Sequence, residues 1–251
     1  MDNSFNFRQH FLVILFLLGC IWPNRLPAQD ESADDNLFTQ SNQAWVYELY
    51  DSLFETNLDL INGRNHSERY PAGTGHPFFI SQQSMPGHII CGGKKYTYPH
   101  IRYDVFNDML QIHHFARTGS YILDLNKQDI DGFKLDGHTF VQIREDEIHD
   151  AGITPGFYEL KHQGKYTFWI RWEKNYSDRT VETSGGYENS EQRYIQAGDQ
   201  WYRIVNRRSL LKAIPEYQDE IKAYLRNSGI SLRIATVEEL LTVIRYCESI
   251  E

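Results

Sequence analysis

Short apolar segments joined in pairs by tight turns recur between residues 78 and 204, and they constrain the fold more than any other feature. Residues 87–91 and 94–98, for example, flank Gly92-Gly93. Two-residue connections of this kind are typical of antiparallel hairpins. Later pairs turn at Asn107-Asp108, Gly137, Gly164 and Gly198. Because consecutive hairpins usually pair with their neighbours, we expect a β-rich antiparallel meander, either a twisted sheet or an open barrel.

Helical patterns precede and follow this region. Apolar residues fall three and four apart over residues 44–61, which predicts an amphipathic N-terminal helix. After residue 209, Pro215 fits the start of one helix, and the capping-box pair Thr236 and Glu239 fits the start of another. We therefore expect a single α+β domain. Its predicted ranges are 41–251 overall, 78–204 for the β-rich part and 209–248 for the helical part.

The first 28 residues have the three-part pattern of a secretory signal peptide. Arg8 and His10 precede an apolar run of 12 residues, and Ala28 ends the segment. A membrane-spanning helix needs about 20 apolar residues, so the run is too short to be one. We expect cleavage after Ala28 or, alternatively, lipid attachment at Cys20, which follows Leu17-Leu18-Gly19. The protein is thus predicted to be periplasmic, associated with the outer membrane or extracellular, with residues 29–40 as a disordered lead-in.

The net charge limits the expected binding partners, and the cysteine content limits the possible disulfides. The net charge is −9 at pH 7, and nucleic-acid-binding surfaces are basic, so nucleic acid is not an expected partner. A lipid on Cys20 would supply the expected membrane contact. Cys91 and Cys247 remain after cleavage. They form either a disulfide that closes a long loop, which an oxidising compartment permits, or two small buried side chains.

The histidines and acids do not match a catalytic or metal motif. His113 and His114 are adjacent in a predicted strand, so their side chains point to opposite faces. The segment Glu147-Ile-His149-Asp150 lacks the second histidine of the zinc motif H-E-x-x-H. The acidic turn at residues 124–135 has the wrong register for a calcium loop. We expect no catalytic residue, cofactor or metal. The histidines left as candidates for a site assembled by the fold are His138, His149 and His162.

Two polar segments are interpreted as exposed to solvent. Residues 175–192 form a long connection with Ser184-Gly185-Gly186 near its middle. Loops of this length are usually functional or disordered, and disorder is predicted here. Arg207 and Arg208, with Lys212, make a small basic patch that is interpreted as a solvated face.

Trp169 and Arg171 are the candidate contact for a ligand or partner. Strand alternation places Tyr166, Phe168 and Ile170 on one face and these two residues on the other. The first face is uniformly apolar and is predicted to meet the core. Trp169 is then either a partly exposed contact beside Arg171, of the kind enriched at binding hot spots, or covered because the sheet is buried on both faces.

Four motifs and the closing helices resemble uncharacterised secreted proteins of Bacteroidetes-type bacteria. The motifs are Leu60-Ile-Asn-Gly-Arg64, Gly75-His-Pro-Phe-Phe79, Arg102-Tyr-Asp-Val-Phe106 and Gly156-Phe-Tyr-Glu159, and the helices run from Tyr217 to Tyr246. The resemblance covers most of the chain after the signal segment. It implies a bacterial envelope setting and brings no known activity.

The leading functional expectation is an exported, non-catalytic envelope protein that binds a small ligand or an envelope protein. One alternative is an envelope hydrolase whose site is built from scattered histidines and acids. The other is a structural subunit of an envelope assembly.

Overall fold

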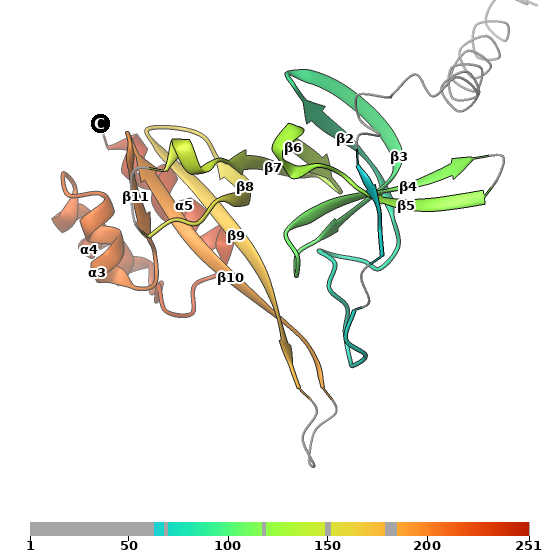
Figure 1. Ribbon diagram of the computed structural model, residues 1–251. Helices are drawn as coiled ribbons and strands as arrows, with labels where there is room; N and C mark the ends of the chain where they lie inside the picture. The colour runs from blue at the N-terminus through green and yellow to red at the C-terminus, as the bar shows by residue number, and fades with distance from the viewer. Residues whose placement is uncertain (1–62, 68–69, 117–118, 149–151, 179–184, 251) are drawn as a thin grey trace, which may run out of the picture. The chain divides into compact units, whose positions relative to one another are not determined.

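The computed structural model describes residues 63–67, 70–116, 119–148, 152–178 and 185–250. The predicted signal peptide, the lead-in, the N-terminal helix and Cys20 lie outside these residues. The described chain forms one open antiparallel sheet of 11 strands, in the order β1-β5-β4-β3-β2-β6-β7-β8-β9-β10-β11, followed by three helices (Figure 1). The β-rich α+β class is confirmed, and the sheet is not a closed barrel.

The elements have the following bounds. The strands are β1 Arg64–Asn65, β2 Met85–Cys91, β3 Lys94–Asp104, β4 Met109–Ala116, β5 Gly119–Asp124, β6 Ile130–Leu135, β7 His138–Ile143, β8 Gly156–His162, β9 Tyr166–Ser177, β10 Gly186–Ala197 and β11 Gln200–Arg203. The helices are the short 3-10 turns η1 Lys127–Asp129 and η2 Glu145–Glu147, and the α-helices α3 Arg207–Ala213, α4 Gln218–Ser228 and α5 Val237–Ser249.

The predicted hairpin turns are confirmed. Gly92 and Gly93 join β2 to β3 with φ of 56° and 75°, a left-handed conformation that glycine adopts without a Cβ clash. Asn107-Asp108 joins β3 to β4, and Gly137 joins β6 to β7. Gly164 lies between β8 and β9, and Gly198 between β10 and β11.

The order of the strands departs from a simple meander at β2. This strand pairs with β3 on one side and with β6 on the other, so β3, β4 and β5 form an excursion before the chain returns. Strand β5 was not predicted. It pairs with β4 along residues 119–124, and β1 covers its end at Leu123 and Asp124.

The predicted disordered loop at 175–192 is wrong where the structure describes it. Strands β9 and β10 pair over their whole lengths, from Tyr166↔Ala197 to Ser177↔Gly186. Strand β8 pairs only with residues 168–170 of β9, and β11 only with residues 194–197 of β10. The rest is a two-stranded ribbon whose residues are mostly half-buried, and its polar side chains belong to paired strands (Figure 1).

The N-terminal segment after β1 packs along this ribbon. Thr74 forms a parallel bridge to Gly186, and the Tyr176 hydroxyl donates a hydrogen bond to the Ala72 carbonyl at 2.8 Å. The Lys174 ammonium reaches the His76 carbonyl at 2.8 Å. These contacts join segments about a hundred residues apart, which no local pattern predicts.

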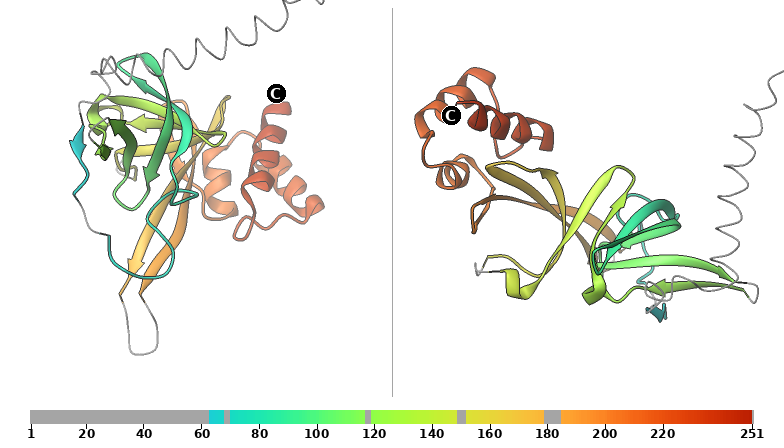
Figure 2. Two further views of the ribbon diagram at one scale, coloured as in Figure 1. Left: turned by 90° about the vertical axis from the view of Figure 1, so that its right-hand side faces the viewer. Right: turned by 90° about the horizontal axis from the view of Figure 1, so that it is seen from above.

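The buried apolar side chains form three clusters. The first lies between one face of β9 and β10 and the three α-helices, which gather beside that face (Figure 1; Figure 2). The second is built on β2 to β8 and contains the aromatic group Tyr103, Phe133, Phe140 and Phe157. Trp172 packs against both of these clusters. None of the helices in the described residues is long and apolar enough to cross a membrane.

The helices begin where the sequence predicts them, within two or three residues. At α5 the Thr236 hydroxyl accepts from the Glu239 backbone N–H at 3.2 Å, and the Glu239 carboxylate accepts from the Thr236 N–H at 2.7 Å. This is the predicted capping box. Helix α4 begins at Gln218, three residues after Pro215.

Trp169 belongs to the third buried cluster, which lies on the other face of β9 from the helices. Tyr166, Phe168 and Ile170 meet the helices as predicted. On the other face Trp169 is only 8% exposed, stacks on Trp201 with ring centroids 5.6 Å apart and donates to Gln196 Oε1 at 3.1 Å. The expectation of a partly exposed Trp169 is therefore wrong, because β11 supplies a covering aromatic, and the alternative of a sheet buried on both faces holds.

Of the two alternatives for Cys91 and Cys247, the disulfide is wrong. Cys247 is a free thiol, fully buried among the helices, whereas Cys91 borders the cluster built on β2 to β8. Burial raises the pKa of the Cys247 thiol to about 12, so it is protonated at neutral pH. Of the two interpretations, that of small packing side chains fits Cys247.

Candidate functional site

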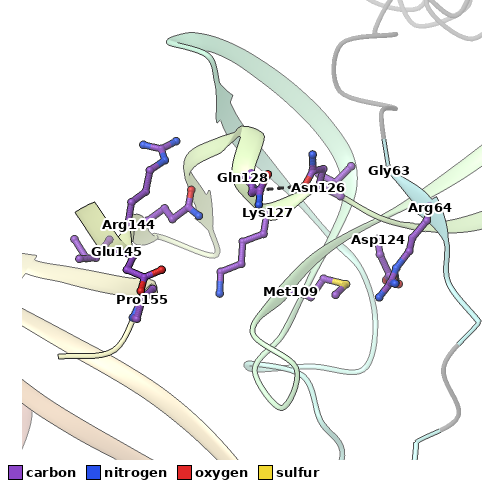
Figure 3. A pocket seen from close by; sticks show the side chains of 13 residues that line it. Gly63, Arg64, Met109, Asp124, Asn126, Lys127, Gln128, Arg144, Glu145 and Pro155 are labelled. Carbon is purple, nitrogen blue, oxygen red and sulfur yellow. Dashed lines mark hydrogen bonds and ion pairs between the residues drawn. The ribbon is translucent and has the colours of Figure 1, made fainter. Parts of the chain in front are cut away.

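A cleft of about 790 Å³ opens between the η1 turn that follows β5 and the η2 turn that follows β7. Arg64 and Asp124 lie on one side, Arg144 and Pro155 on the other, and Lys127 extends between them (Figure 3). The remaining lining residues are Gly63, Met109, Leu125, Asn126, Gln128, Gln142, Ile143 and Glu145. We call this hollow the cleft.

Asp108 does not line the cleft, but it contacts Lys127, which does. The Lys127 ammonium contacts Asp108 Oδ2 at 2.5 Å, and the Tyr103 hydroxyl donates to Asp108 Oδ1 at 2.7 Å. The backbone N–H of Phe157 also points to Oδ1, at 3.4 Å. Asp108 sits in the β3–β4 turn with φ of 52°, a left-handed conformation that aspartate tolerates better than most residues. One turn side chain thus links β3, η1 and β8.

Arg171, the second predicted contact residue, is a positioning residue behind the cleft. Its guanidinium lies 3.6 Å from Asp108 Oδ2 and 5.2 Å from the centre of the Tyr158 ring. It also donates to the carbonyls of Thr154 at 3.4 Å and Pro155 at 3.3 Å. Since Pro155 lines the cleft, Arg171 fixes part of its wall. Because Trp169 is buried, the two residues do not form the exposed contact that was predicted.

A glycine makes this arrangement possible. A Cβ on Gly156 would lie 2.2 Å from Arg171 Nη1 and 2.4 Å from Asp108 Oδ2. A side chain there would push the ion pair apart. The first residue of the motif Gly156-Phe-Tyr-Glu159 is therefore small because the Asp108–Arg171 pair passes over its Cα.

Gln142 brings an unsatisfied polar atom to the cleft. Its side chain is 8% exposed, and its Oε1 has no hydrogen-bond partner within the described residues. Buried amide oxygens are almost always hydrogen-bonded, so an orphan of this kind needs an explanation. Met109, Leu125 and Ile143 supply apolar surface around it. This oxygen is covered, so a ligand in the cleft would reach it only after the Gln142 side chain turned toward the opening.

Asp124 forms the opposite wall and belongs to a buried polar network. Its carboxylate accepts from Gln111 Nε2 at 2.8 Å and contacts His66 Nδ1 at 2.9 Å. The His66 ring stacks on Tyr70, with centroids 5.3 Å apart, and His66 Nε2 is buried without a partner among the described residues. The exposed Arg64 approaches Asp124 at 3.9 Å. An aspartate that orients a histidine in this way leaves Nε2 as its reactive nitrogen.

The same network continues through Tyr70 to Asp104. The Tyr70 hydroxyl donates to Asp104 at 2.7 Å, and Arg102 donates to Gln111 Oε1 at 2.8 Å. Burial, together with the negative Asp104, raises the pKa of Tyr70 well above its usual value, so the phenol stays protonated. The motif from Arg102 to Phe106 therefore contributes to structure through Arg102 and Asp104.

The predicted histidines do not converge. His138 pairs with Glu159 at 2.6 Å, and His162 pairs with Glu248 at 2.7 Å. His114 contacts the Tyr98 hydroxyl at 2.8 Å, while His113 packs against Phe115. His149 lies outside the described residues. Within the parts of the chain that the structure describes, no group of three or more potential ligands is placed to hold a metal ion.

Sequence reasoning missed the residues that form the cleft. Lys127, Gln142 and Arg144 follow no motif, and Asn126 to Gln128 look like ordinary turn residues. Asp124 was weighed only as a calcium ligand. No protein-family model, curated protein or solved structure matches the chain. The functional proposal therefore depends on the chemistry of the cleft.

Proposed function

We propose that the protein is an exported, non-catalytic envelope protein that binds a small ligand, or a short segment of a partner, in the cleft. The observation that carries the proposal is Gln142, a residue that lines an open cleft and whose buried Oε1 has no hydrogen-bond partner among the described residues. A ligand in the cleft that donates a hydrogen bond would satisfy this oxygen once the Gln142 side chain turned toward it.

The charges around the cleft support binding in preference to catalysis. Asp108 is engaged by Lys127 and Tyr103, and Asp124 by Gln111 and His66. Carboxylates held by several fixed partners serve structure more readily than they transfer protons. The preferred ligand has an apolar body facing Met109 and Leu125 and a donor group, such as an amide N–H or a hydroxyl.

The export part of the proposal is tested on the protein made by its native cell. The purified protein should begin at Gln29 or at a lipid-modified Cys20. N-terminal sequencing and intact mass of envelope fractions measure this directly. A cytoplasmic protein that begins at Met1 would contradict export and leave the cleft unaffected.

The cleft is tested by titrating a panel of amino acids, dipeptides and monosaccharides in a calorimeter. At least one compound should bind to the wild type, and Gln142→Leu, which removes the acceptor at similar volume, should weaken that binding about tenfold. Gln200→Leu, at an exposed position of β11 that does not line the cleft, is the control and should bind as the wild type does. If none of the panel binds, or if both variants bind equally well, the cleft is not the binding site.

A second candidate function, an envelope hydrolase, rests on the His66–Asp124 pair. His66 Nε2 could act as a general base if the residues that bury it moved aside. We expect the wild type to hydrolyse chromogenic ester and phosphate substrates no faster than the uncatalysed background, and His66→Gln to give the same rate. A wild-type rate clearly above background that this substitution abolishes would favour the enzyme.

A further inference from the structure

Four arginines surround a second hollow of about 540 Å³, on the helical side of the molecule. Arg207 and Arg208 come from the first turn of α3, Arg226 from the last turn of α4, and Arg233 from the connection to α5. Asn206, Leu225, Ile230, Ser231 and Leu232 complete the lining. We call this the arginine hollow. It is separate from the cleft and does not rest on the function proposed for it.

Within the described residues, no acidic side chain forms an ion pair with the arginines of the hollow. No acidic residue lines it, and all four arginines are exposed. In the part of the chain that the structure describes, none of the four makes an ion pair. By contrast, Arg144 is paired with Asp131 at 2.8 Å. The chain as a whole carries a net charge of −9, whereas these four arginines have no ion-pair partner among the described residues. They therefore create a local positive potential in the hollow.

The base that carries these arginines is firmly packed. Leu225 and Leu232, which lie beside Arg226 and Arg233, are buried in the helical core cluster. The Asn206 side chain caps α3 by accepting from the Ser209 N–H at 3.1 Å, and Leu210 of that helix is fully buried. The arginines therefore project from fixed positions, and little backbone order has to be gained when a ligand binds.

We infer that the arginine hollow binds a phosphate group. Guanidinium groups present parallel N–H donors that match phosphate oxygens, so several arginines around one concave site favour phosphate over a single carboxylate. A hollow of this size accepts a headgroup or a phosphorylated small molecule. A long nucleic acid would meet the acidic remainder of the chain and is disfavoured.

Two exposed apolar side chains favour a lipid as the source of the phosphate. Val205 is 52% exposed and precedes Asn206, and Ile234 is 84% exposed and follows Arg233. An apolar side chain next to a basic site is suited to the boundary between headgroups and acyl chains. The preferred ligand is therefore the headgroup of an anionic phospholipid.

The test compares vesicles with a soluble phosphate probe. The full chain should sediment with phosphatidylcholine vesicles that contain phosphatidylglycerol and not with phosphatidylcholine alone, and it should bind inorganic pyrophosphate in a calorimeter. The double variant Arg226→Gln/Arg233→Gln should weaken both by about tenfold or more. Arg203→Gln/Arg245→Gln removes the same charge from exposed positions outside the hollow and should change binding less than twofold.

Each outcome decides a part of the inference. Ile234→Ser should weaken vesicle binding and leave pyrophosphate binding unchanged. Pyrophosphate binding without any vesicle binding would keep the phosphate site and overturn the lipid as its source. If neither vesicles nor pyrophosphate bind, the site itself is overturned. The same holds if the two double variants lose equal affinity, because diffuse surface charge would then explain the binding. Equal midpoints of thermal unfolding in all variants would show that the substitutions leave the fold intact.

Discussion

Replacing Glu159 by alanine should lower the free energy of unfolding by about 3 kcal/mol, the low end of the range for breaking a buried ion pair. Glu159 in β8 is 1% exposed. Its carboxylate accepts from the Trp172 indole at 2.7 Å and contacts His138 at 2.6 Å and Lys161 at 3.0 Å. Without it, three polar groups lose their partner, and the tryptophan that borders two core clusters loses its anchor. His138 and Lys161 keep some contact with water, which limits the loss.

Urea unfolding followed by tryptophan fluorescence and circular dichroism measures the effect. Glu159→Gln keeps an acceptor for Trp172 and should lose about 1–2 kcal/mol. Glu188→Ala, on the exposed part of β10, is the control and should stay within about 0.5 kcal/mol of the wild type. A Glu159→Ala protein as stable as this control would show that the carboxylate does not hold the sheet together.

Asp108→Ala should destabilise the protein by about 2–3 kcal/mol and also weaken any ligand bound in the cleft. The substitution removes the acceptor shared by Tyr103 and Lys127, releases Arg171, and leaves alanine in a left-handed backbone conformation. Arg171 in turn holds Pro155, so the wall of the cleft loosens. Asp108→Asn tolerates the same backbone and keeps an acceptor, and it should lose only about 1 kcal/mol.

A second aspartate separates the backbone effect from the side-chain effect. Asp136, in the exposed β6–β7 turn, has φ of 47°, close to that of Asp108. Asp136→Ala should therefore report the left-handed strain alone, about 1 kcal/mol. Chemical unfolding of both variants makes the comparison. If the two alanine variants lose the same stability, the contacts of Asp108 add nothing to the fold.

Local sequence patterns were reliable for the turns, the caps and one face of β9. Gly92, Gly93 and Gly137 adopt positive φ angles that few other residues tolerate. Glycines between two short apolar segments therefore indicate a hairpin turn. Thr236 and Glu239 satisfy the orphan N–H groups of their own helix, which involves residues only three apart. Alternation along β9 correctly placed Phe168 and Ile170 against the core. Each of these inferences depends on neighbours in the chain.

The errors and omissions all concern partners that are distant in the chain. Trp169 lies on the opposite face of β9 from Phe168 and Ile170, so the sequence pattern suggested that it was exposed. It is buried because Trp201, on β11, stacks on it. Residues 175–177 and 186–192 are mostly polar, so their sequence shows no periodic apolar signal and resembles a loop. Their pairing in β9 and β10 depends on the opposite strand and on the segment at residues 72–76.

The candidate sites were beyond sequence for the same reason. Gln142 becomes an unsatisfied acceptor only because the turns after β5 and β7 meet around it, and Arg226 and Arg233 gather beside Arg207 only when α3 and α4 pack on the sheet. The chain alone therefore settles its turns, its helix ends and the side of a strand that is apolar, since these follow from φ angles, capping and period. Which strands become neighbours, which faces are covered and which charges converge depend on long-range packing, because contacts between residues far apart in sequence leave no periodic pattern within either segment.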